Sequence, residues 1–281
     1  MVSERASQQA FWGASALLFA ASTAGTIVWC APMSAMGGMP MPGGWTMSMT
    51  WMRMPWQTWS GAASSFLGMW VLMMVAMKLP SLTPMLWRYR QEYLQKYGQE
   101  YGQAVGRPGG VRLGRMTALV GAGYFFVWTV IGMAAFPLGI ALAAVEMQKP
   151  ALARAVPIAA GVVVLIAGAF QLSVWKARQL ACCRAFYKEA PGNGRSLPVD
   201  RGGAWRYGLR HGIHCSRCCA GLMAILLVVG VMDLLAMAVV AAAITAERLA
   251  PDGERVARAI GVAAVGAGLF LIARAIGLSG F

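Results

Sequence analysis

Long apolar stretches separated by short polar segments form the main hydrophobic pattern of this chain. Six stretches have the roughly 20 mostly apolar residues that a helix needs to cross a bilayer core. The pattern therefore predicts an all-α, polytopic membrane protein that forms one membrane domain over residues 1–281. The expected spans cover residues 10–30, 60–79, 116–136, 155–175, 218–244 and 257–276.

Composition supports this class of protein. Hydrophobic residues make up 58% of the chain and charged residues only 12%, whereas a soluble domain carries about 25% charged residues. The 6 cysteines in 281 residues are too sparse for a secreted disulfide scaffold. The sequence contains no Walker-type loop, nucleophile elbow, kinase motif set or HExxH motif, so it gives no reason to expect an ATP-driven pump or a hydrolase.

The net charge of +14 is distributed unevenly along the chain. Of the 24 Lys and Arg residues, sixteen lie in the segments that follow the second and fourth expected spans, counted with their edges. Basic residues concentrate on the cytoplasmic side of a membrane. We therefore expect both termini and the basic loop 176–217 to be cytoplasmic in a bacterial inner membrane. This distribution explains the charge without nucleic acid as a partner.

Methionine is concentrated in segment 31–58, together with Gly and Trp, on the expected periplasmic side. Thioether sulfur is a soft, uncharged ligand that selects Cu(I) over hard ions. The alternative is that Met and Trp fill irregular gaps at the membrane interface. The eight candidate ligands of this loop are Met33, Met36, Met39, Met41, Met47, Met49, Met52 and Met54.

A second group of methionines lies inside the second expected span. Met69, Met73 and Met77 recur every four residues, so they share one helix face at about 6 Å spacing. Such a stripe could pass a thioether-bound ion along the helix, or it could be a Met-rich seam between helices.

Three further polar residues fall in or near the expected spans. Asp233 lies in the middle of the fifth span, where a carboxylate is a candidate functional group or a hydrogen-bonded neutral acid. Lys78 and Glu247 lie near span ends, and we expect both to reach the membrane interface.

Five of the six cysteines lie near the expected cytoplasmic ends of the fourth and fifth spans, and Cys30 alone has no assigned role. The i, i+3, i+4 spacing of three of them places their sulfurs on one side of a helix. The cytoplasm is reducing, so disulfides are not expected, and flanking arginines favour the metal-binding thiolate. The alternative is that these are inert small residues at a helix interface. The candidate ligands are Cys182, Cys183, Cys215, Cys218, Cys219 and His214, although His214 could instead be a solvated group.

Two sequence pieces resemble a bacterial family of predicted metal-binding integral membrane proteins. They are the Met-rich segment 69–81, MWVLMMVAMKLPS, and the Cys-x-x-Cys-Cys segment 215–223, CSRCCAGLM. The resemblance extends over roughly residues 30–275, and it implies a membrane protein that binds a metal ion. Near the fourth span the family has two spaced cysteines, where this chain has Gln179 and Cys183.

These patterns leave three hypotheses open. The first is a membrane protein that handles or transports Cu(I), with the lipid bilayer and the metal ion as its partners. The second is a structural or metal-delivering subunit of a larger membrane complex or copper enzyme. The third is a thiol oxidoreductase coupled to quinone, which would need a reactive thiol on the outer side, where only Cys30 lies.

Overall fold

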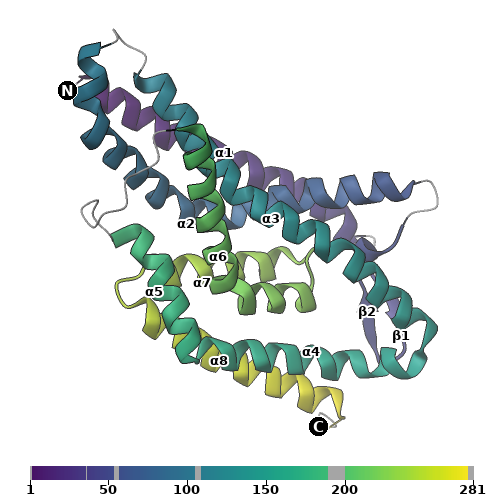
Figure 1. The fold of residues 1–281 in the computed structure, drawn as a ribbon. Helices are drawn as coiled ribbons and strands as arrows, with labels where there is room; N and C mark the ends of the chain where they lie inside the picture. The colour runs from purple at the N-terminus through teal and green to yellow at the C-terminus, as the bar shows by residue number, and fades with distance from the viewer. Residues whose placement is uncertain (1, 36, 54–56, 105–108, 189–199, 278–281) are drawn as a thin grey trace.

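The structure is a computed structural model that describes residues 2–35, 37–53, 57–104, 109–188 and 200–277 (Figure 1). Within these ranges it is a helical protein with one small hairpin, as expected from the hydrophobic pattern. The helices are α1 (Val2–Ala35), α2 (Trp59–Ala104), α3 (Gly109–Gln148), α4 (Pro150–Gln171), α5 (Val174–Lys188), α6 (Arg201–Val229), α7 (Leu234–Leu249) and α8 (Gly253–Ala275), and the strands are β1 (Met39–Met41) and β2 (Trp45–Met47), followed by a 3₁₀ turn (Met49–Trp51).

Six of the described helices are long and apolar enough to cross a membrane: α1, α2, α3, α4, α6 and α8. This confirms the prediction of an all-α polytopic protein. The third expected span ends at residue 136, whereas α3 continues through Pro137 to Gln148. The expected basic loop 176–217 is largely helical, because α5 and the first half of α6 occupy most of it.

The expected fifth span, 218–244, is not one continuous helix. The helix α6 ends at Val229, and Gly230 follows with φ 140°, a backbone conformation that favours glycine. Asp233 then accepts a hydrogen bond from the Ala236 amide at 2.8 Å and caps the N-terminus of α7. The expected intramembrane carboxylate is therefore an exposed helix cap.

Beyond this break, α7 runs back along α6. Arg248 in the last turn of α7 contacts Cys215 in the middle of α6, so the two helices form a hairpin. The 16 residues of α7 span about 24 Å, which is less than the roughly 30 Å of a bilayer core. Figure 1 shows α6 and α7 between the α1–α2–α3 group and the α4–α8 pair.

The extra reversal at α7 changes where the chain ends. Because Arg90 of α2 donates to Ser7, α1 begins beside the C-terminal half of α2. The helix α8 packs antiparallel to α4, with Ile272 beside Gly161, so its end lies toward the β-hairpin. The two ends of the described chain thus lie at opposite ends of the bundle (Figure 1). The expectation of two cytoplasmic termini assumed a continuous fifth span, and it does not follow from this arrangement.

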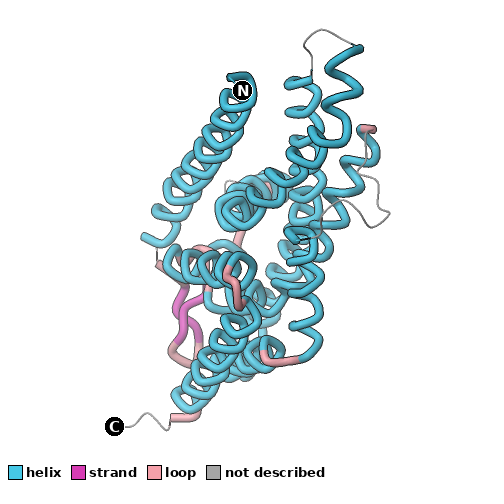
Figure 2. Tube along the Cα trace, turned by 90° about the vertical axis from the view of Figure 1, so that its left-hand side faces the viewer, coloured by secondary structure: helices cyan, strands magenta, loops and turns pink. Residues whose placement is uncertain are grey.

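The Met-rich segment is partly folded. The strands β1 and β2 pair antiparallel, with Met39 opposite Met47, and Gly43 and Gly44 form the turn with positive φ. The Trp45 indole donates to the Ala153 carbonyl at 2.8 Å and so attaches the hairpin to the start of α4. The two strands are drawn in magenta in Figure 2.

Candidate metal centre

Four thiols from α5 and α6 lie together in the interior. Cys183, Cys215, Cys218 and Cys219 are each at most 1% exposed. Their side chains interact with one another in the order 183–218–219–215, which we call the thiol chain. Among the described residues, no three His, Cys, Asp or Glu side chains are arranged around one point as a metal ligand set. The thiols therefore offer pairs of adjacent sulfurs rather than a closed cage.

Two of the predicted ligands, Cys182 and His214, are not buried with these four thiols. Cys182 is exposed, so the adjacent Cys183 alone contributes from α5. The hydrogen bond with Cys218 lowers the pKa of the Cys183 thiol, against the opposing effect of burial. The imidazole of His214 is only half-buried, and it is the His214 carbonyl oxygen that lies 3.3 Å from Cys183 Sγ.

A buried arginine contacts the other end of the thiol chain. Arg248 is 3% exposed, and its Nη2 lies 2.8 Å from Cys215 Sγ and 3.1 Å from Cys219 Sγ. Its Nη1 donates to Ser81 Oγ at 3.4 Å. A guanidinium at this distance stabilises a thiolate by charge and by hydrogen bonding. The pattern of basic residues along the sequence gives no sign of this contact.

A tyrosine and a histidine enclose the same sulfurs. Tyr124 of α3 has its hydroxyl 2.8 Å from Cys215 Sγ. This contact depends on close helix packing, because a Cβ on Gly212 would lie only 3.0 Å from the Tyr124 carbonyl oxygen. The fully buried His211 ring lies 5.4 Å from the Tyr124 ring. His211 is thus the buried histidine of this region, whereas His214 is half-buried.

An ion pair supports the thiol chain from the side of α4 and α7. Lys176 Nζ lies 2.7 Å from Glu247 Oε2 and donates to the Cys218 carbonyl at 2.8 Å. Gln171 donates to the other Glu247 oxygen at 2.5 Å. Burial raises the pKa of Glu247, and the neighbouring Lys176 partly offsets that shift. Glu247 is 2% exposed, so the prediction that it reaches the membrane interface is wrong.

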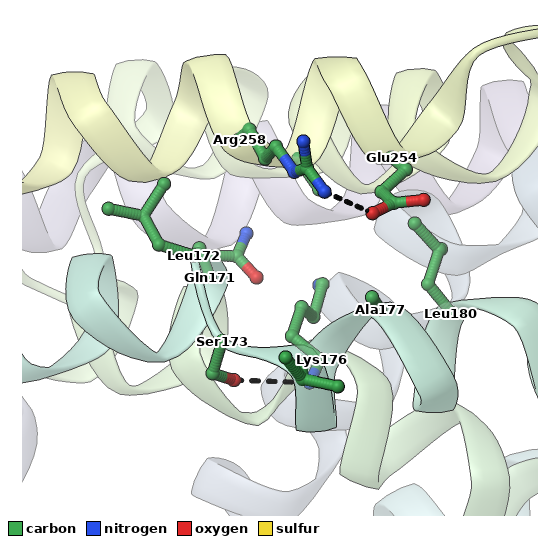
Figure 3. A pocket seen from close by; sticks show the side chains of 10 residues that line it. Gln171, Leu172, Ser173, Lys176, Ala177, Leu180, Glu254 and Arg258 are labelled. Atoms are coloured by element: carbon green, nitrogen blue, oxygen red, sulfur yellow. Dashed lines mark hydrogen bonds and ion pairs between the residues drawn. The ribbon is translucent and has the colours of Figure 1, made fainter.

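A small cavity lies beside this ion pair, at the junction of α4, α5 and α8. Its volume is about 110 Å³, and its lining includes Gln171, Ser173 and Lys176. Figure 3 shows the Arg258–Glu254 ion pair of α8 on the opposite wall. A cavity of this size has room for water, for which Gln171, Ser173 and Lys176 would be the polar partners.

The predicted methionine stripe is buried in the same core as the thiols. Met69, Met73 and Met77 are 1%, 0% and 3% exposed. They belong to one cluster of buried residues that also contains Cys215 and Cys219. Other buried methionines of this cluster are Met74, Met85, Met116, Met223, Met232 and Met237. Soft sulfur ligands are therefore found through the core from α2 to the thiol chain.

The family model described as PpoB2, copper chaperone, matches residues 67–271. The chain belongs to this copper chaperone family. The matched region contains the methionine stripe, the four thiols, Tyr124 and Arg248. Searches of the curated proteins and of the solved structures gave no significant match.

The outer methionines lie before the region matched by the copper chaperone family. In the hairpin, Met39, Met41 and Met47 share one face with Trp45, because side chains alternate along a strand. Met47 is 2% exposed, and Met39, Met41 and Met52 are half-buried. Met36 and Met54 lie outside the described residues, as do the side chains of Met33 and Met49.

Lys78 is fully buried. The prediction that its side chain reaches the membrane interface is therefore wrong. Its Nζ lies 4.4 Å from the centroid of the Trp128 ring and 3.6 Å from Met223 Sδ. The Trp128 backbone is fixed by Trp70, whose indole donates to the Trp128 carbonyl at 2.8 Å.

Proposed function

We propose that this protein is a membrane copper chaperone that holds Cu(I) on the buried thiols of α5 and α6. The observation that carries the proposal is the contact of Arg248 with Cys215 and Cys219. Thiolate is a soft ligand that selects Cu(I). One Cu(I) with two thiolates carries one negative charge, and the adjacent guanidinium neutralises it. A buried site needs such compensation, because an uncompensated charge in the interior is very costly.

The buried methionines give this proposal a route for the ion. The outer hairpin presents thioethers of Met39, Met41 and Met47, and the α2 stripe continues with Met69, Met73 and Met77. Neutral thioethers bind Cu(I) more weakly than thiolates, which both donate more strongly and neutralise the ion. Copper captured by the hairpin would therefore move toward the thiols. From there it would be transferred to a copper-requiring partner, such as a larger membrane complex.

The test is a competition for Cu(I) between the purified, detergent-solubilised protein and a chromophoric Cu(I) chelator, without oxygen. We expect the unmodified protein to retain Cu(I), and the double variant Cys215→Ser/Cys219→Ser to lose it. Cys182→Ser is the matched control, because Cys182 is exposed and adjacent to Cys183, and it should bind Cu(I) like the unmodified protein. Retention of Cu(I) by the double variant would refute the proposed site.

The quinone-linked thiol oxidoreductase has less support from the structure. Such a reaction needs an accessible thiol on the outer side. Cys30 is fully buried, and its Sγ lies 3.5 Å from Met232 Sδ. Contact between a thiol and a thioether fits soft-metal chemistry better than disulfide exchange.

A further inference from the structure

Lys78 is a buried cation in an environment of uncharged, polarisable groups. The face of the Trp128 ring and the Met223 sulfur contact its ammonium group. In the described ranges, the ion pairs are Lys176–Glu247, Arg255–Asp252 and Arg258–Glu254, and none includes Lys78. Its charge is thus stabilised by an aromatic ring and a thioether.

These two groups would also suit a soft monovalent metal ion. An aromatic face attracts any desolvated cation, and a thioether adds a donor that prefers Cu(I) to hard ions such as Mg²⁺. A hydrated divalent ion would find no oxygen ligand in this pair. The contacts around Lys78 therefore select for a soft ion of charge +1.

The position of these contacts matters for the route of copper. Lys78 follows Met77, the last residue of the α2 stripe, and Met223 lies one helical turn after Cys219 on α6. The ammonium group interacts electrostatically with the sulfurs of Cys215 and Cys219. The pair Trp128–Met223 thus lies between the methionine stripe and the thiol chain.

We propose that Trp128 and Met223 form a soft-cation subsite between the stripe and the thiols, and that the Lys78 ammonium occupies it in place of a metal ion. This inference rests on the proposed binding of Cu(I) to the thiols. Two unit positive charges repel strongly at contact distance inside a protein, so Lys78 and Cu(I) exclude each other from the subsite. While the ammonium occupies the subsite, copper on the thiols is retained rather than conducted back to the stripe. Copper passes from the stripe to the thiols only when the ammonium moves out of the subsite.

The test compares Lys78→Met with Lys78→Leu, two side chains of similar size of which only methionine supplies a sulfur. Cu(I) equivalents per protein are counted by chelator competition, and Trp128 emission is taken as the difference from the same protein carrying Trp128→Phe. We expect Lys78→Met to bind one more equivalent than the unmodified protein and to show quenched Trp128 emission. Lys78→Leu should bind no additional equivalent.

Two results would overturn the inference: no additional equivalent in Lys78→Met, or an additional equivalent that leaves Trp128 emission unchanged. A second test, on the unmodified protein, measures Trp128 emission during Cu(I) loading and does not depend on whether the variants fold. Cu(I) loading should leave its Trp128 emission unchanged, and quenching there would show that metal enters despite Lys78. Thiolate-to-copper absorption distinguishes the two proposals. Its absence in the unmodified protein refutes the proposed function, whereas normal absorption without a gain in Lys78→Met refutes only the subsite.

Discussion

Breaking the buried ion pair between Lys176 and Glu247 should weaken both the fold and the proposed copper site. The two side chains are 1% and 2% exposed, and their charged atoms are 2.7 Å apart. The variant Glu247→Gln keeps the shape of the side chain but removes its charge. It leaves the Lys176 ammonium buried with only the Cys218 carbonyl and a neutral amide as neighbours.

The size of the effect follows from the burial of both partners. Removing one partner of a buried ion pair costs about 3–5 kcal/mol, because the remaining charge is uncompensated, whereas replacing both partners by neutral groups is often close to neutral. We therefore expect Glu247→Gln to destabilise the protein by about 3–5 kcal/mol. The double variant Lys176→Met/Glu247→Gln should recover most of this loss.

The assay is unfolding in detergent micelles by titration with a denaturing detergent, together with Cu(I) affinity by chelator competition. Because Lys176 donates to the Cys218 carbonyl, the single variant should also bind Cu(I) more weakly. The matched control is Glu254→Gln in the exposed pair with Arg258, whose side chains are 55% and 64% exposed. An exposed i, i+4 pair contributes only about 0.3–0.5 kcal/mol, so this control should change little.

The reasoning would be refuted by either of two results. One is a Glu247→Gln variant as stable as the exposed control. The other is a double variant Lys176→Met/Glu247→Gln with a lower free energy of unfolding than Glu247→Gln alone, as expected if the two substitutions act independently. Either result would mean that the Lys176 and Glu247 charges are not coupled.

Two further predictions concern separate parts of the molecule. Replacing Met69, Met73 and Met77 by Leu should lower the free energy of unfolding by less than about 1.5 kcal/mol per site and leave Cu(I) binding by the thiols unchanged. The same variant should accumulate less copper in cells, and normal accumulation would show that the stripe only packs the core. Asp233→Ala should destabilise α7 by about 1 kcal/mol through loss of its N-cap, without changing Cu(I) affinity, as measured by thermal unfolding and chelator competition.

Much of the fold could be predicted because the bilayer fixes the length of each apolar run. The break at Gly230 was missed because the run 218–244 is long enough for one span, so Asp233 was interpreted as an intramembrane group. A better interpretation was available from local rules. A glycine ends a helix, and an aspartate followed by an apolar run begins the next one. These signals predict the turn between α6 and α7.

The partners of the thiols could not be predicted from spacing alone. The i, i+3, i+4 pattern places Cys215, Cys218 and Cys219 on one side of α6, and the structure buries all three. Tyr124 and Arg248 come from α3 and α7, however, and their contacts depend on how the helices pack. The distribution of Lys and Arg gave no sign of Arg248, because it assigns basic residues near span ends to one side of the membrane and not to the interior. Lys78, Arg90 and Lys176 are buried, so three of the sixteen residues in that count do not lie on the surface.

The reversal of the chain at Gly230 gives the thiol chain its charged neighbours. Because α7 runs back along α6, the consecutive residues Glu247 and Arg248 reach the interior beside the thiols. Glu247 neutralises Lys176, which holds the Cys218 carbonyl, and Arg248 contacts the sulfurs of Cys215 and Cys219. A continuous fifth helix would carry both residues away from the thiols. The proposed site therefore depends on the α6–α7 hairpin. A site bordered by a buried ion pair and a buried arginine suits a protein that retains copper until a partner removes it better than it suits an open channel.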